Sequence, residues 1–239
     1  ASESTPLTNQ GFTDIKDLEP GELIYVNKDG YSVRRFTEIR TKSFCFFEHV
    51  YFANIGSRLE GKSVYKTRRK LGEALAQGET QDLSPCDCIA VPVPDTAKPA
   101  CDGMAFKLGI PSREGLIRNR YVGRTFIEGN DRAKRANRKF SVLPEVVEGK
   151  RVFLVEDSVV RSTTLRVIVE MLREAKVSEI HVRVTCPPIV APCMYGIDMS
   201  SIDELLVPKH VKNPQNITQE EYQSIADDLG VDSLRYLTV

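Results

Sequence analysis

The sequence has no tryptophan, no net charge and no long apolar run. Its 33 basic and 33 acidic residues balance over 239 positions. A chain without an overall field is not expected to bind nucleic acid or an anionic membrane surface. No apolar stretch approaches the roughly 20 residues of a membrane-spanning helix, and the N-terminus has no basic segment followed by an apolar one. With 41% hydrophobic residues, we expect one main globular core in a cytoplasmic protein.

The sequence also lacks a disulfide pattern and an initiating methionine. Its six cysteines are spread along the chain without the close, regular spacing of a disulfide framework. Cys86 and Cys88 are too close together to imitate a zinc knuckle. In a cytoplasmic protein these thiols are expected to be reduced and mostly buried. Because the chain starts at Ala1, we interpret it as a piece of something longer.

What the sequence does contain is an alternation of strand and helix patterns. The expected strands start at Phe44 and cover 88–93, 152–155, 180–184 and 233–239. The expected helices cover 62–77, 97–108, 165–172 and 218–229. The last of these has a capping box of Thr218 and Glu221 and a stop at Gly230. Strands alternating with helices are typical of a doubly wound α/β domain.

The stretch 151–164 carries the clearest functional pattern. A continuous apolar run at 152–155 is typical of a strand buried on both faces, so Glu156 and Asp157 should emerge at its carboxyl end. Ligands of open α/β sheets bind at that edge. The next segment, 161–164, places hydroxyls and backbone N–H groups at a helix N-terminus, which attracts phosphate. Together these features predict a phosphosugar site.

These residues resemble the type I phosphoribosyltransferases, which carry two acidic residues followed by a Thr-rich phosphate turn. Further stretches resemble one branch of that family in the same order along the chain: 17–22, 45–52, 91–96, 119–127 and 192–198. The resemblance implies a central, mostly parallel sheet flanked by helices over residues 41–239. Residues 1–40, a small β-rich segment, are similar to the end of an N-terminal glutaminase domain.

The resemblance also implies an activity, first of all a glycosyltransferase. In that branch ammonia attacks C1 of phosphoribosyl pyrophosphate and gives 5-phosphoribosylamine and pyrophosphate, the first step of de novo purine synthesis. Mg²⁺ is the implied cofactor, purine nucleotides are the implied inhibitors, and a homo-oligomer is the implied assembly. Glutaminase activity is not expected, because the catalytic N-terminal cysteine of that branch is missing.

Residue roles follow from the same resemblance. Arg118, Tyr121 and Arg124 are the implied catalytic residues, within a basic stretch (118–139) that the family uses as a loop closing over the substrate. Mg²⁺ would be held by Thr96, Glu156 and Asp157, since a hard cation prefers oxygen ligands. The substrate-binding residues would be Asp95, Thr96, Glu156, Asp157, Ser158, Arg161, Ser162, Thr163 and Thr164.

The chain departs from the family pattern at three places. Glu156 stands where the family normally has Asp, and Ser162 stands where it usually has Gly. If the backbone at Ser162 has a positive φ, a residue with a Cβ costs on the order of 1 kcal/mol there, and we expect weaker substrate binding. Segment 128–131 looks shortened, which would alter loop closure. These departures keep open a second hypothesis, a catalytically weak module that binds phosphoribosyl pyrophosphate or a purine nucleotide.

Other interpretations also stay open. Residues 56–63 fit the Walker A pattern of a P-loop NTPase, but Glu60 would bring negative charge beside the phosphates, so an ordinary turn is favoured. A salvage transferase acting on a free base is a further alternative. Cys45 and Cys193 match two ligands of a [4Fe-4S] cluster in one branch of the family, although four thiolates are needed and buried thiols are the simpler explanation. The other motifs also have simpler structural explanations. An adjacent acidic pair is often solvated surface, a turn rich in Ser and Thr is often a helix cap, and a basic run is often a solvated face.

Overall fold

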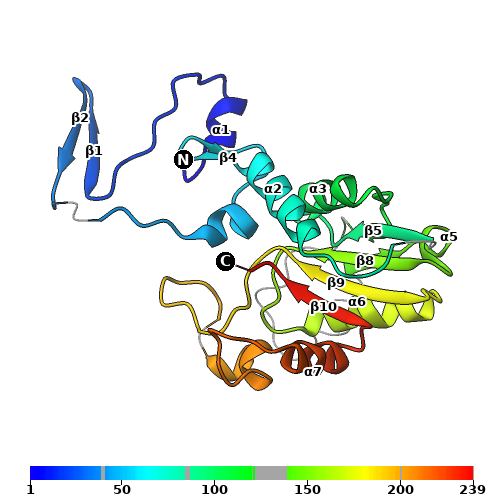
Figure 1. Cartoon of the computed structure of the whole chain (residues 1–239). Helices are drawn as coiled ribbons and strands as arrows, with labels where there is room; N and C mark the ends of the chain where they lie inside the picture. The colour runs from blue at the N-terminus through cyan, green and yellow to red at the C-terminus, as the bar shows by residue number, and fades with distance from the viewer. Residues whose placement is uncertain (39–40, 84–86, 120, 122–138, 200, 239) are drawn as a thin grey trace. The chain divides into compact units, whose positions relative to one another are not determined.

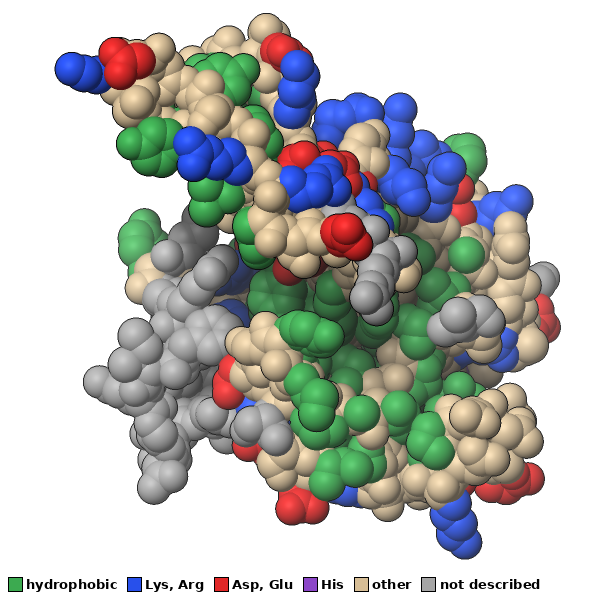
Figure 2. Space-filling view, turned by 90° about the vertical axis from the view of Figure 1, so that its left-hand side faces the viewer, with side chains coloured by type: hydrophobic (Ala, Val, Ile, Leu, Met, Phe, Trp, Pro, Cys, Tyr) green, Lys and Arg blue, Asp and Glu red, His purple; other side chains and the backbone are tan. Residues whose placement is uncertain are grey.

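The computed structural model describes the chain except residues 39–40, 84–86, 120, 122–138, 200 and 239 (Figure 1). The chain divides into two compact units, 1–67 and 68–239. No helix among the described residues is both long and apolar enough to cross a membrane. Figure 2 shows acidic and basic side chains interspersed at the surface, in keeping with the zero formal charge.

The first unit is built from short elements. They are α1 (Ser4–Asn9), β1 (Glu22–Asn27), β2 (Gly30–Arg35), the π-helical turn η1 (Glu48–Phe52), β3 (Arg58–Leu59) and β4 (Lys62–Ser63). β1 and β2 form an antiparallel hairpin in which Asn27 lies opposite Gly30. Gly30 has φ 133°, and Gly readily adopts the positive φ of such a turn.

The strand expected from Phe44 is wrong. The chain forms η1 there, and aromatic side chains four and five residues apart pack on one another. The ring centroids of Phe47 and Tyr51 lie 5.9 Å apart, and those of Phe47 and Phe52 lie 5.8 Å apart. Aromatic residues favour strands on average, but here the contacts that they make within one turn decide the local structure.

The second unit is an α/β domain. Its helix α2 (Val64–Gln77) begins at the end of the first unit, and the remaining elements are β5 (Cys88–Pro92), α3 (Lys98–Leu108), β6 (Leu116–Arg118), β7 (Phe140–Val142), α5 (Pro144–Val147), β8 (Arg151–Glu156), α6 (Thr163–Glu174), β9 (Glu179–Val184), the 3-10 turns η2 (Ile202–Glu204) and η3 (Val207–Lys209), α7 (Gln219–Leu229) and β10 (Ser233–Tyr236). The order β10-β9-β8-β5 forms a sheet in which every neighbouring pair is parallel. The predicted α/β class is confirmed.

The sheet is covered on both faces. On one face α2 and α3 pack against Ala90, Phe153 and Val155, and α6 and α7 lie together on the other (Figure 1). Residues 152–155 of β8 are fully buried, as the continuous apolar run predicted. The capping box at Thr218 and the left-handed glycine that ends α7, Gly230 at φ 73°, are also confirmed.

Two glycines allow α2 and α3 to touch through their backbones. A Cβ on Gly72 would lie 1.8 Å from the carbonyl oxygen of Ala100, and a Cβ on Gly103 would lie 2.3 Å from that of Arg69. Both distances are far below a van der Waals contact. No side chain therefore fits between the two helices at these positions.

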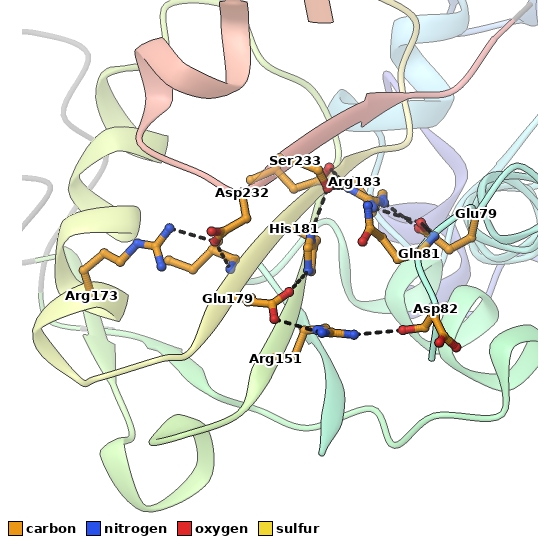
Figure 3. Close-up of polar contacts among 12 residues, drawn as sticks. Glu79, Gln81, Asp82, Arg151, Arg173, Glu179, His181, Arg183, Asp232 and Ser233 are labelled. Atoms are coloured by element: carbon orange, nitrogen blue, oxygen red, sulfur yellow. Dashed lines mark hydrogen bonds and ion pairs between the residues drawn. The ribbon is translucent and has the colours of Figure 1, made fainter. Parts of the chain in front are cut away.

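β9 buries its polar residues as well as its apolar ones. The sequence predicted the strand from Ile180, Val182 and Val184, but His181 and Arg183 are 2% and 1% exposed. Arg183 donates to both carboxylate oxygens of Glu79, at 2.6 and 2.9 Å. Figure 3 shows this pair beside His181, whose ring nitrogens contact Ser233 at 2.8 Å and Glu179 at 3.0 Å. Charge pairing compensates for burial on this strand.

The cysteines do not all behave as expected. Cys45, Cys101, Cys186 and Cys193 are free thiols, and burial raises the pKa of Cys101 and of Cys186 to about 12. Cys88 is disulfide-bonded, so the expectation that every thiol is reduced is wrong at this position.

Candidate active site

The acidic pair lies at the carboxyl edge of the sheet, on a strand with a parallel neighbour on each side. β8 ends at Glu156, and Asp157 follows directly with 6% exposure. Burial raises the pKa of Glu156 well above its usual value, and the negative charge of Asp157 raises it further. Burial likewise raises the pKa of Asp157, to about 6. Two carboxyl groups confined in this way attract a cation or a hydroxyl donor.

Asp157 is also held by hydrogen bonds. The hydroxyl of Ser158 donates to its Oδ1 at 2.6 Å, and the side chain of Thr96 lowers its pKa. Thr96 belongs to the loop after β5, which pairs with β8, and the N–H of Val93 continues this pairing to the carbonyl of Val155 at 2.9 Å. The pairing brings the acidic pair to the loop of Asp95 and Thr96, some 60 residues away along the chain.

The loop of Asp95 and Thr96 contacts β6, the strand that leads into the basic segment. Its peptide bond between Pro94 and Asp95 is cis. The carboxylate of Asp95 accepts from the guanidinium of Arg118, with 3.2 Å between Oδ2 and a terminal nitrogen. Arg118 ends β6, and Asn119 continues the pairing with a bond from its N–H to the carbonyl of Lys139 at 2.8 Å. The structure therefore brings Asp95, Thr96, Arg118 and Asp157 to one place.

The phosphate turn between β8 and α6 has the backbone that the family pattern predicted. Ser162 has φ 62° and ψ −16°, in the left-handed region, and α6 begins at Thr163. The carbonyl of Ser162 accepts the N–H of Arg166 at 2.9 Å. Backbone N–H groups and the hydroxyls of Thr163 and Thr164 thus stand at a helix N-terminus, where a phosphate is favoured.

Arg161 points away from this turn. Its Nε donates to Glu204 at 2.8 Å, and a terminal nitrogen donates to the carbonyl of Asp198 at 2.7 Å. The guanidinium of Arg161 thus links the turn to Asp198 and Glu204. Its role in binding substrate stays a prediction.

One charged residue near the acidic pair was missed by the sequence reasoning. Arg68, on α2, is 4% exposed, and its positive charge lowers the pKa of Asp157 against the effect of burial. It lies in a run of basic residues on α2, in which Lys66 and Lys70 face solvent. The spacing of the run alone does not separate one buried arginine from its exposed neighbours.

Several predicted roles stay predictions. Arg120, Arg124 and segment 128–131 lie outside the described residues. Tyr121 is fully exposed, and its N–H donates to the side chain of Asn119 at 3.0 Å. Cys45 and Cys193 lie in different units, and the described part of the chain has no cluster of three or more His, Cys, Asp or Glu residues that could hold a metal ion.

The Walker A pattern is a β-hairpin. β3 and β4 pair antiparallel, with Leu59 opposite Lys62. The turn between them places Glu60 at φ 50° and Gly61 at φ 71°, the two positive values of a type I′ turn. A tight hairpin does not wrap its N–H groups around a phosphate, so the P-loop interpretation is wrong for this segment.

Replacing Lys62 with alanine is therefore expected to leave pyrophosphate release within about twofold of the unchanged chain, as for an exposed surface substitution. Pyrophosphate release and ATP hydrolysis would be measured side by side. ATP hydrolysis that disappears in this variant would restore the NTPase hypothesis.

Curated proteins that are similar in sequence to this chain include amidophosphoribosyltransferases. The chain is 39% identical over 241 residues to the amidophosphoribosyltransferase of Bacillus subtilis, covering 100% of the chain and 48% of that protein. It is 41% identical over 257 residues to the enzyme of the same name from Methanocaldococcus jannaschii, covering 100% of the chain and 51% of that protein. The chain thus spans about half the length of these relatives. No family model matches the sequence.

A solved structure agrees with the sequence comparison. The glutamine phosphoribosylpyrophosphate amidotransferase of B. subtilis, complexed with ADP and GMP, superposes with a TM-score of 0.83 over 100% of this chain and 50% of that one, at 39% identity. A second structure, of the allosteric regulatory enzyme of purine biosynthesis, gives the same TM-score. The chain is therefore similar, over its whole length and in its fold, to about half of an amidophosphoribosyltransferase.

Proposed function

We propose that this chain transfers the phosphoribosyl group of phosphoribosyl pyrophosphate to ammonia. The bond between C1 and the pyrophosphate oxygen breaks, a bond between nitrogen and C1 forms, and the nitrogen loses a proton, which gives 5-phosphoribosylamine and pyrophosphate. The observation that carries the proposal is the parallel pairing of β5 with β8, which continues to a bond from the N–H of Val93 to the carbonyl of Val155 at 2.9 Å. Through it, a phosphate turn, an acidic pair and a second loop meet at the carboxyl edge of the sheet, where three parts of one substrate can bind at once.

Each part of the site has a role in this proposal. The turn at 161–164 binds the 5′-phosphate, Glu156 and Asp157 accept hydrogen bonds from the ribose hydroxyls, and the loop at Asp95 and Thr96 lies beside the pyrophosphate. Arg118, which is bonded to Asp95, contributes positive charge near the leaving group. Catalysis then comes from positioning and from charge stabilisation of a cation-like sugar.

The donor set at the acidic pair suits Mg²⁺. Carboxylate and hydroxyl oxygens are the ligands that this ion prefers, and a cation would favour the charged forms of two acids whose pKa values burial raises. We propose that Glu156, Asp157 and Thr96 hold it. Bound there, Mg²⁺ would neutralise negative charge on the departing pyrophosphate.

Further properties are proposed from the relatives. Since the B. subtilis structure contains ADP and GMP, purine nucleotides are proposed as inhibitors of this chain. A cytoplasmic homo-oligomer, and the assignment of residues 1–40 to the end of a glutaminase domain and of 41–239 to the transferase domain, are proposed from the resemblance. An iron–sulfur cluster would need two thiolates besides Cys45 and Cys193, so no step is derived through it.

The test is pyrophosphate release from phosphoribosyl pyrophosphate and Mg²⁺, with and without ammonium at alkaline pH. Release that depends on ammonium is the expected result. Substrate binding without release would support the alternative, a binding module, which is favoured by the strained backbone at Ser162 and by the longer side chain of Glu156. Release that depends on a free purine base would instead identify a salvage transferase.

A further inference from the structure

One arginine, Arg166, links the phosphate turn to α7. Arg166, in the first turn of α6, donates from Nε to the hydroxyl of Ser162 at 3.2 Å. A terminal nitrogen of the same guanidinium pairs with Asp228 Oδ2 at 2.5 Å. The other terminal nitrogen donates to the backbone carbonyl of Asp228. The guanidinium therefore spans from the turn to α7 and has a partner for each of its three nitrogens.

Asp228 has a fixed position of its own. Its Oδ2 lies 3.1 Å from Nε2 of His210, whose Nδ1 lies 2.9 Å from the hydroxyl of Ser224. The hydrogen bond from Arg166 lowers the pKa of Asp228 against the effect of burial, so Asp228 is ionised at neutral pH. An ionised, oriented acid holds a guanidinium in one place.

The contact with Arg166 determines whether the Ser162 hydroxyl acts as a hydrogen-bond donor or acceptor toward a ligand. A hydroxyl has one proton to donate and two lone pairs to accept with. When a guanidinium occupies a lone pair, the proton points elsewhere, and the cation polarises the O–H bond and strengthens it as a donor. Ser162 lies in the turn that we propose binds the 5′-phosphate, so an anion there is the natural acceptor.

We propose that Arg166, oriented by Asp228, positions the hydroxyl of Ser162 as a donor to the 5′-phosphate. This inference rests on the proposed function, and it gives a purpose to the serine that replaces the usual glycine. The strain at Ser162 is present in the structure without a ligand. It therefore lowers the stability of the fold and not the affinity for substrate, whereas the hydroxyl adds a bond that glycine cannot make.

The chain contains a matched control. Arg173 lies two turns further along α6, and it pairs with Asp232 at 2.7 Å as Arg166 pairs with Asp228. The two ion pairs are equally exposed, at 38% and 37% for the one and 40% and 35% for the other. Arg173 contacts the carbonyl of Gly230, whereas Arg166 contacts Ser162. Loss of either guanidinium should affect folding alike and phosphate binding differently.

Three variants of the full chain, Arg166→Gln, Arg173→Gln and Ser162→Gly, and the double variant with Arg166→Gln and Ser162→Gly would be compared by calorimetric binding of ribose 5-phosphate. Arg166→Gln and Ser162→Gly are each expected to weaken binding about tenfold, as for a lost bond to a charged group. The double variant should be no weaker than either one, because both remove the same bond. Arg173→Gln should bind normally, and kcat for pyrophosphate release should change less than about twofold in Arg166→Gln.

Three outcomes would overturn the inference: equal binding by the two arginine variants, additive losses in the double variant, or tighter binding by Ser162→Gly, which is the result expected if strain limits affinity. Normal binding of ribose 5-phosphate without any pyrophosphate release would count against the proposed function alone. Thermal unfolding of each variant separates a folding defect from a binding defect.

Discussion

Replacing Asp157 with asparagine is expected to abolish pyrophosphate release and, at the same time, to stabilise the fold. We propose that Asp157 holds the ribose and Mg²⁺, so its loss should lower kcat/KM by on the order of 100-fold or more, as for a removed charge-stabilising group. Its burial beside Glu156, however, makes the ionised form costly in the absence of a ligand. The neutral amide avoids that cost while keeping an oxygen for the hydroxyl of Ser158.

The pH dependence of this stabilisation has a definite sign. The pKa of Asp157 in the folded chain, about 6, lies above the usual 3.8. A raised pKa of an acid means that stability is fully present below about pH 4 and is lost as pH rises through 6. The gain in unfolding free energy should therefore be about 3 kcal/mol near pH 8 and close to zero near pH 4.

Urea unfolding of both proteins at several pH values, together with the pyrophosphate assay, tests this prediction. Asp227→Asn is a suitable control, because Asp227 is an exposed acid of α7 whose carboxylate accepts from Gln223 at 2.8 Å. That variant should change neither quantity. An asparagine variant of Asp157 that is less stable than the unchanged chain at pH 8 would contradict the account of the acidic pair.

Removing one side of the buried pair between Glu79 and Arg183 is expected to produce the largest loss of stability. The two side chains are 3% and 1% exposed (Figure 3). Burial alone would raise the pKa of Glu79, but the hydrogen bonds and charge of Arg183 outweigh it and lower the pKa to about 2. Glu79→Gln leaves a buried guanidinium without its counter-charge, and the loss should be about 3–5 kcal/mol at neutral pH.

This loss also depends on pH. Because the pKa of Glu79 in the folded chain lies below its usual 4.5, the stability from the pair is present above that value and disappears as pH falls through about 2. The difference in unfolding free energy between the unchanged chain and Glu79→Gln should therefore shrink between about pH 5 and pH 2.

A surface pair provides the comparison. Glu73 lies 3.2 Å from Arg69 on α2 with side chains that are 34% and 43% exposed, and Glu73→Gln should cost less than about 0.5 kcal/mol. A double replacement of Glu79 and Arg183 by leucine and methionine should recover most of the loss. If Glu79→Gln is as mild as the surface variant, the pair does not anchor the sheet in the way described.

The sequence predicted the elements whose cause is local. The apolar run of β8, the capping box at Thr218 and the glycine stops all depend on neighbours within a few residues, and each is confirmed. The positive φ at Ser162 was also expected from the family pattern. These features account for most of the sheet and for the phosphate turn.

The features that the sequence did not predict depend on distant partners. Arg183 is separated from Glu79 by 104 residues, and nothing near either residue marks it as buried. The same holds for Arg68, whose charge reaches Asp157 from another element. Around Phe44 the error had a different origin, because aromatic residues favour a strand on average yet stack on one another within η1.

Because the backbones of α2 and α3 are in direct contact, the two helices are expected to move together. α2 carries Arg68, and α3 follows directly after the loop of Asp95 and Thr96, so anything that separates the helices also changes the geometry of that loop. A methyl group on Gly72 or Gly103 would do so, since neither position has room for it. A genetic screen would then score these two glycines as loss-of-activity positions, although neither is among the predicted site residues.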